Sequence, residues 1–162
     1  MAFRLVSSGG SVKDAAVVNL FASGTVRPGM AVEFTRGTIT TQGFVGPASS
    51  STTITNIFGV CLDYAQGASD VEVKVIPILS GQVWEADCVQ AAATLQIGKR
   101  QALYGSNSVL INNNAYDQTS ATGVFVIWNI TGATTGSGKV LGEFLRVPAG
   151  VHQAGIAGEV YF

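Results

Sequence analysis

Hydrophobic and polar side chains alternate along most of the chain, and this two-residue period is typical of β-strands. In VEVKVIPI (71–78), three valines fall on one face while Glu72 and Lys74 fall on the other. The segment GVFVIWNI (123–130) is dense in β-branched and aromatic residues, which predicts a strand buried on both faces. Further strands are predicted at 30–35, 58–64, 81–89, 101–105, 108–113 and 140–147. The pattern therefore predicts an all-β chain.

Segments rich in turn-forming residues separate the predicted strands, among them RPG (27–29), PASSSTT (47–53) and QGAS (66–69). One segment, SVKDAAVVNLFA (11–22), has two interpretations. It is either a short helix capped by Ser11 or part of an extended arm, and the sequence leaves both open.

The chain also contains a weak internal repeat. TVRPGMAVEFT (25–35) and the strand beginning Gly59-Val60 are matched, in the same order, by TLQIGKRQALYG (94–105) and the strand beginning Gly123-Val124. The repeat predicts one compact body built from two similar β-units over residues 23–147. Residues 1–22 are predicted to form an extended N-terminal arm and residues 148–162 a C-terminal tail.

Composition narrows the classes of function. Charged residues make up 12% of the 162 residues and the net charge is −1, so uncharged polar residues must cover most of the surface. Such a surface is typical of a protein that contacts partners or copies of itself. The nine Lys and Arg residues are scattered, which argues against nucleic-acid binding. No apolar run is long enough to span a membrane and no secretory signal is present, so we expect a protein made and used without export.

The glycine-rich stretch TGATTGSGKVLG (131–142) suggests a phosphate-binding loop, but its details do not fit. That motif requires a glycine where the chain has Ala133 and a hydroxyl residue where it has Val140. The stretch also leads into a strand pattern rather than a helix. We therefore predict a hairpin turn and no nucleotide or other cofactor.

Carboxylates offer two further candidate sites. Glu85 and Asp87 lie two apart on a predicted strand, so they share a face and suggest acid–base chemistry. Acidic residues 63, 70 and 72 flank one turn and suggest calcium binding, although no calcium-loop motif is present. A solvated polar face explains both groups more simply, and we predict neither catalysis nor a metal site.

The remaining chemically active residues are isolated. Cys61 and Cys88 lie in strand-like segments and are expected to be reduced core residues. His152 has no partner within a nucleophile motif. Exposed aromatic residues would suit a glycan-binding surface, so a carbohydrate-binding module stays an alternative to a structural protein and to an enzyme.

The order of certain glycine, apolar and polar residues along the chain resembles that of a known protein family. It is carried by Phe58 to Asp63, Ala65-Gln66-Gly67, the alternating valines 71–75, Gly81 to Trp84, Ala91-Ala92, Gly98-Lys99, Leu103-Tyr104, Thr119 to Thr122 and Gly123-Val124. This order, over roughly residues 24–147, resembles the small head decoration, or capsid cement, proteins of tailed bacteriophages. The chain departs from it in inserted loops at 47–56 and 106–121 and in both ends.

The resemblance implies a structural virion protein and not an enzyme. It implies that the all-β body is a single compact β-barrel or β-sandwich that binds the outer surface of an assembled phage capsid, contacts the lattice of the major capsid protein and stabilises the shell. It also implies a homotrimer, made in the host cytoplasm and located on the virion. The alternative is a non-catalytic carbohydrate- or host-surface-binding module of a phage particle.

Apolar residues in the predicted arm and tail are the candidates for capsid or subunit contacts, because arms of this kind add a strand to a neighbouring sheet. They are Phe3, Leu5, Val6, Val12, Val17, Val18, Leu20, Phe21, Tyr161 and Phe162.

Overall fold

The computed structural model describes residues 3–7, 16–35, 44–66, 69–105, 109–113, 121–133 and 135–146. Strands and one 3-10 helix (Thr94–Gln96) make up their regular structure. The strands are β1 (Arg4–Ser7), β2 (Val18–Ser23), β3 (Ala31–Phe34), β4 (Phe44–Pro47), β5 (Ile57–Cys61), β6 (Ser69–Pro77), β7 (Val83–Cys88), β8 (Arg100–Leu103), β9 (Leu110–Asn112), β10 (Phe125–Ile130) and β11 (Lys139–Phe144).

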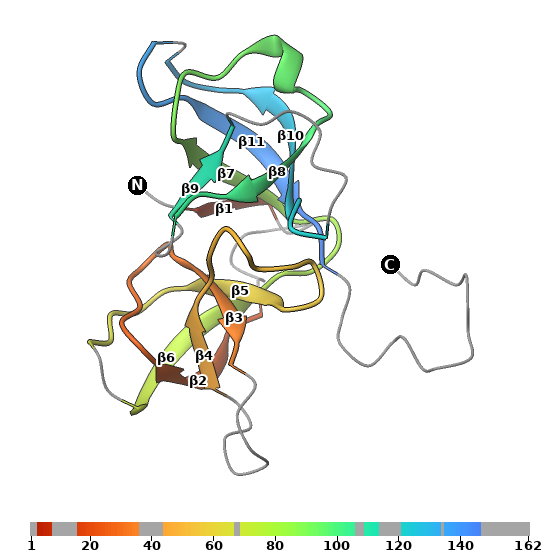
Figure 1. The fold of residues 1–162 in the computed structure, drawn as a ribbon. Coiled ribbons are helices and arrows are strands. Elements are labelled where there is room, and N and C mark those ends of the chain that lie inside the picture. Colours follow the sequence, from red (N-terminus) through yellow and green to blue (C-terminus); the bar gives the residue numbers. More distant parts are fainter. Residues whose placement is uncertain are drawn as a thin grey trace.

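The strands form two closed barrels. Barrel 1 has the order β2-β4-β3-β5-β6 and closes through the antiparallel pairing of β6 with β2. Barrel 2 has the order β7-β9-β8-β10-β11 and closes through the antiparallel pairing of β11 with β7. Figure 1 shows barrel 2 above barrel 1, with β1 between them. The predicted all-β body of two similar units is confirmed, and each unit is a barrel of its own.

The two barrels share topology and register. In each, the first strand pairs in parallel with the third, β2 with β4 and β7 with β9. The pairs Phe21↔Phe44 and Ala22↔Val45 of barrel 1 correspond to Asp87↔Leu110 and Cys88↔Ile111 of barrel 2. The same equivalence runs through the antiparallel pairings, so every strand of one barrel has a matched strand in the other.

A glycine turn is repeated before the second strand of each barrel. Gly29 and Gly98 both have φ of 80°, a conformation that glycine adopts without steric cost. Each glycine donates its backbone N–H to a carbonyl on the fourth strand, Gly29 to Cys61 and Gly98 to Ile127, both at 2.7 Å. The register therefore makes Cys61 equivalent to Ile127, and Val60 to Val126 rather than to Val124 as the sequence repeat suggested.

Two apolar clusters form the core. The smaller cluster fills barrel 1 and includes Val32, Val45 and Val75. The larger fills barrel 2 and continues to the β3-β5-β6 face of barrel 1 through Ala31, Val60 and Ile76. Every residue of β5 is buried, because one side of this strand lines barrel 1 and the other joins the larger cluster.

The strand predicted to be buried on both faces was residues 123–130, and this prediction is wrong. In β10, Phe125 and Ile127 face the barrel interior and are fully buried, whereas Trp128 is 45% exposed. β-Branched and aromatic content indicates a strand, but it does not reveal which faces of that strand another unit covers. The second barrel lies on β5 instead.

The predicted arm is part of the folded body where the structure describes it. β1 pairs with β7, and residues 18–22 belong to β2, which is one of the strands of barrel 1. The alternative of a helix reaching residue 22 does not hold over β2, while residues 11–15 lie outside the described residues. The predicted C-terminal tail, 148–162, also lies outside them.

Candidate functional site

Of the candidate contact residues near the N-terminus, Leu5 and Val6 belong to β1 and Phe3 directly precedes it. Two of them, Phe3 and Leu5, are core residues. Phe3 is 3% exposed and Leu5 is 8% exposed. The Phe3 ring centroid lies 4.8 Å from that of Phe144 and 6.0 Å from that of Phe125, both in barrel 2. Its backbone N–H donates to the carbonyl of Gly29 in barrel 1 at 2.9 Å. These two side chains therefore join the barrels within one chain and are not surface for another molecule.

The candidates on and beside β2 are more accessible. Val17 is 48% exposed, and Val18 and Leu20 are only partly buried against the core of barrel 1. Phe21 is 42% exposed, and its ring centroid lies 5.6 Å from that of Phe44 on the neighbouring strand. Val6 on β1 is also exposed. The candidates Val12, Tyr161 and Phe162 lie outside the described residues.

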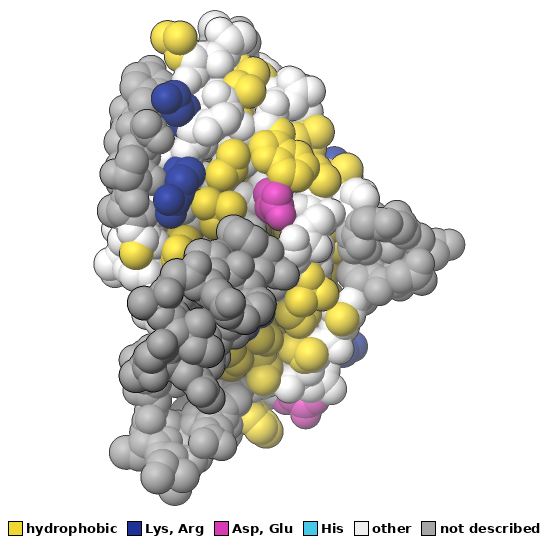
Figure 2. Space-filling model, turned by 90° about the vertical axis from the view of Figure 1, so that its right-hand side faces the viewer, with side chains coloured by type: hydrophobic (Ala, Val, Ile, Leu, Met, Phe, Trp, Pro, Cys, Tyr) yellow, Lys and Arg dark blue, Asp and Glu magenta, His cyan; other side chains and the backbone are white. Residues whose placement is uncertain are grey.

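Exposed apolar side chains are not confined to the predicted arm. Both barrels present large hydrophobic residues at the surface, and Figure 2 shows such side chains over upper and lower parts of one face with few charged groups among them. Sequence reasoning did not select these residues as contacts, because strand residues were taken as core. They are Phe34, Leu62, Tyr64, Val71, Leu79, Leu95, Ile97, Tyr104 and Trp128.

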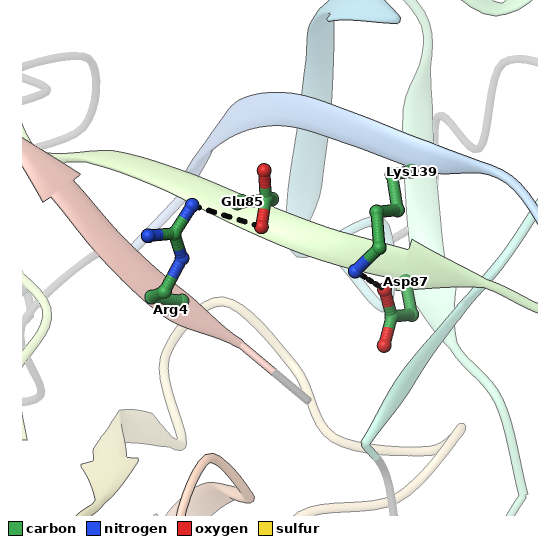
Figure 3. A network of polar contacts seen from close by, with 4 residues as sticks. All are labelled: Arg4, Glu85, Asp87 and Lys139. Carbon is green, nitrogen blue, oxygen red and sulfur yellow. Dashed lines mark hydrogen bonds and ion pairs between the residues drawn. The ribbon is translucent and has the colours of Figure 1, made fainter. Parts of the chain in front are cut away.

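Glu85 and Asp87 lie on the same face of β7, as predicted, and each carries an ion pair (Figure 3). Arg4 on β1 lies 3.1 Å from Glu85, and Lys139 on β11 lies 2.7 Å from Asp87. Each pair joins β7 to a neighbouring strand. The two carboxylates therefore help to hold three strands together across the outside of barrel 2.

The environment of Asp87 favours its ionised form. Burial by itself would raise the pKa of this carboxyl, but hydrogen bonds and charges of cationic groups, the hydrogen bond of Lys139 first among them and those of the terminal amine next, oppose burial and the net pKa is lowered. In return, the hydrogen bond to Asp87 raises the pKa of the Lys139 amine. A carboxylate held ionised is unsuited to donate a proton near neutral pH, so this arrangement supports a structural salt bridge.

The glycine-rich stretch 131–142 connects the antiparallel strands β10 and β11, so the predicted hairpin is confirmed. Two glycines of this connection are packed closely against neighbouring residues. A Cβ on Gly138 would lie 2.5 Å from the backbone nitrogen of Ala92, and a Cβ on Gly132 would lie 2.6 Å from the Cβ of Lys139. The amine of Lys139 donates a hydrogen bond to the carboxylate of Asp87. Close packing explains these glycines and an ion pair explains the lysine.

The other candidate metal-binding or reactive residues make structural contacts where the structure describes them. The carboxylate of Asp63 accepts the backbone N–H of Lys74 at 2.8 Å. In the described part of the chain, no group of three His, Cys, Asp or Glu side chains is placed to hold a metal ion. Cys61 and Cys88 are buried, which confirms that they are core residues, and burial raises the pKa of the Cys88 thiol to about 12. His152 lies outside the described residues.

Buried amides hold one end of barrel 2 together, and sequence reasoning did not identify them. Asn113 is fully buried, and its side chain bonds the backbone of Gln90 and the carbonyl of Ala91. The Gln96 side chain donates to the carbonyl of Asn113 at 2.9 Å. These bonds satisfy buried polar groups and connect the 3-10 helix to β9, which is a structural role.

Comparison with known proteins does not place the chain in a family. No protein-family model matches it, and no curated protein sequence shows significant similarity to it. No helix among the described residues is long and apolar enough to cross a membrane.

Proposed function

We propose that this protein is a structural component of a phage particle that binds the outer surface of an assembled capsid and stabilises the shell. The observation that carries the proposal is the accessible apolar surface of both barrels, which includes Tyr64, Leu95 and Trp128 at 55%, 75% and 45% exposure. Side chains of this kind favour association with another protein surface. The proposal also rests on the sequence order that resembles the capsid decoration proteins.

The build of the chain suits that role. Two barrels joined by a common apolar cluster form a rigid body, and a rigid protein loses little conformational entropy when it binds. A molecule that binds only the assembled shell stabilises it by mass action, without any chemical step. The proposed partner is therefore the lattice of the major capsid protein, and the proposed assembly is the trimer that the resemblance implies.

The test combines light scattering of the purified chain with co-sedimentation. We expect a defined oligomer that pellets with assembled, undecorated capsids and does not bind free capsid subunits. Added protein should also raise the temperature at which the shells break open. A chain that does not pellet with shells at any concentration would refute the proposal.

One group of observations favours a second function, a carbohydrate- or host-surface-binding module. Three aromatic side chains, Tyr64, Tyr104 and Trp128, are about half exposed. Aromatic faces stack on sugar rings and on other apolar ligands. Binding of the isolated chain to a glycan array, with loss of binding in Trp128→Ala, would favour this function over shell binding.

A further inference from the structure

Barrel 2 carries a docked strand that belongs to neither barrel. One edge of β7 is shared: β9 pairs with Asp87 and Cys88, and β1 pairs with Val83, Trp84 and Glu85. With β1 in place, Leu5 lies opposite Trp84, and Trp84 is only 1% exposed. The first half of this edge is thus a site for a short antiparallel strand.

Barrel 1 has the same site, and there no strand among the described residues fills it. β4 pairs with Phe21 and Ala22, the residues equivalent to Asp87 and Cys88. Residues 17, 18 and 19 are equivalent to 83, 84 and 85, and no strand that the structure describes pairs with them on this edge. We call the side of residues 17–20 directed away from β6 the open edge.

The side chains of the open edge show the consequence. Val18 is equivalent to Trp84 and Leu20 to Ala86, so both belong to the wall that lines the barrel. Trp84 and Ala86 are buried, whereas Val18 and Leu20 are only partly buried and Val17 is 48% exposed. An uncovered strand edge with apolar side chains is a template for pairing with another strand.

We propose that the open edge binds an extended segment of the shell protein, which adds a strand to barrel 1 as β1 does to barrel 2. This proposal rests on the proposed function and names the contact through which it acts. The backbone of the segment would supply hydrogen bonds, and its side chains would supply specificity.

The strand docked on barrel 2, β1, indicates which side chains that segment should carry. Leu5 in β1 and Phe3, which directly precedes β1, alternate with Arg4, so two apolar residues at i and i+2 face the core. On the outer side, Arg4 meets Glu85, and Leu141 lies opposite Glu85 on the next strand. The segment for barrel 1 should therefore carry the same spacing of apolar residues.

The residue between those two apolar positions should differ from Arg4. At the open edge, Asn19 stands in the place of Glu85, and Lys74 lies opposite Asn19. An arginine there would meet the Asn19 amide in place of a carboxylate, with the Lys74 cation one strand further on, so a neutral or acidic residue is favoured. The same argument disfavours β1 of a second copy, which is moreover already paired with β7 of its own chain.

The test is photo-crosslinking with the full chain bound to assembled capsids. A photoreactive benzoylphenylalanine replaces Val17 in one variant, and Ser137, an exposed polar residue in the turn between β10 and β11, in the control variant. We expect the probe at 17 to crosslink to a single segment of the shell protein with the pattern described. We also expect Val17→Glu to weaken pelleting about tenfold or more, because the carboxylate would be partly desolvated beside the docked strand, and Ser137→Glu to leave pelleting unchanged.

The outcomes separate the two proposals. If the chain pellets with shells but the probe at 17 does not react and Val17→Glu pellets normally, the strand-docking proposal is overturned and shell binding stands. If the probe at 17 crosslinks instead to a second copy of this chain, the open edge is a subunit contact and the assigned occupant is wrong. If unsubstituted protein does not pellet at all, both proposals are refuted.

Discussion

The two barrels share one strand topology, but different side chains fill their interiors. At neighbouring interior positions, barrel 1 places Gly59 beside Val75, and barrel 2 places Phe125 beside Gly142. The register makes Gly59 equivalent to Phe125 and Val75 to Gly142. The small residue has thus changed strands between the barrels, which shows that the volume of the pair is constrained more strongly than either residue.

The outer faces differ more than the interiors. On barrel 1, Ala31 and Ile76 are buried in the cluster that joins the barrels. Their equivalents on barrel 2 are Arg100 and Glu143, which are only partly buried. Charged residues at these positions oppose the packing of a further barrel on this face. The comparison shows that one fold presents a covered apolar face in its first copy and a polar face in its second.

The largest expected effect comes from β1, which joins the barrels. Phe3→Ala removes a buried ring from contact with Phe125 and Phe144, and we expect it to lower the free energy of unfolding by about 3–5 kcal/mol. Denaturant unfolding measures the change. Val6→Ala, on the exposed side of the same strand, should change stability by less than about 0.5 kcal/mol. Equal small effects of both substitutions would mean that β1 is a free arm, as the sequence suggested.

Sequence alone predicted most of the described strands, short ones included. Eight predicted strands, from 30–35 to 140–147, are present, among them the four-residue β3 and β8 and the three-residue β9. β1 was missed because its residues were taken as part of a terminal arm, and β4 because its segment FVGP contains glycine and ends in proline. β2 was missed although Val18, Leu20 and Ala22 alternate, because the same segment also fits a helical pattern.

The contact residues were less predictable than the strands. Phe3 and Leu5 were chosen because they lie near a terminus, but burial there depends on pairing with β7, some 80 residues away in sequence. Conversely, Trp128 was expected to be buried and is exposed, because β10 does not lie between the barrels as β5 does. Local pattern identifies strands, while tertiary packing decides which of their faces are covered.

The next effect concerns the two interior glycines. A Cβ on Gly142 would lie 2.0 Å from the carbonyl oxygen of Val126, and one on Gly59 would lie 2.3 Å from that of Ile76. We expect Gly142→Ala and Gly59→Ala each to lower the free energy of unfolding by about 1–3 kcal/mol, because the backbone must shift. Gly24→Ala is the matched control, since its nearest neighbour would be 3.4 Å away.

These substitutions also test whether the barrels are equivalent. Thermal unfolding followed by near-ultraviolet circular dichroism measures both. A destabilisation from Gly142→Ala alone would show that barrel 1 has room that barrel 2 lacks. An effect of Gly24→Ala as large as the other two would contradict the assignment to close packing.

The smallest expected effect comes from a salt bridge on barrel 2 that has no equivalent on barrel 1. Asp87 and Lys139 are equivalent to Phe21 and Glu72, so this salt bridge has no counterpart in barrel 1. The Asp87 side chain is 11% exposed and that of Lys139 is 44% exposed, so we expect Asp87→Asn to cost about 1 kcal/mol at neutral pH. Glu85→Gln should cost less, because its partner Arg4 is 58% exposed.

The pH dependence of this cost identifies its origin. The pKa of Asp87 is lowered in the folded chain, so its stabilisation is complete above the unfolded value of about 3.9 and is lost as the pH falls through the folded value. The pKa of Lys139 is raised, so its contribution is lost only as the pH rises through a folded value above about 10.4. The difference in melting temperature between the unsubstituted chain and Asp87→Asn should therefore be constant near neutral pH and shrink toward acid. A difference that stays constant down to pH values well below the unfolded pKa would show that the substitution acts through packing and not through the salt bridge.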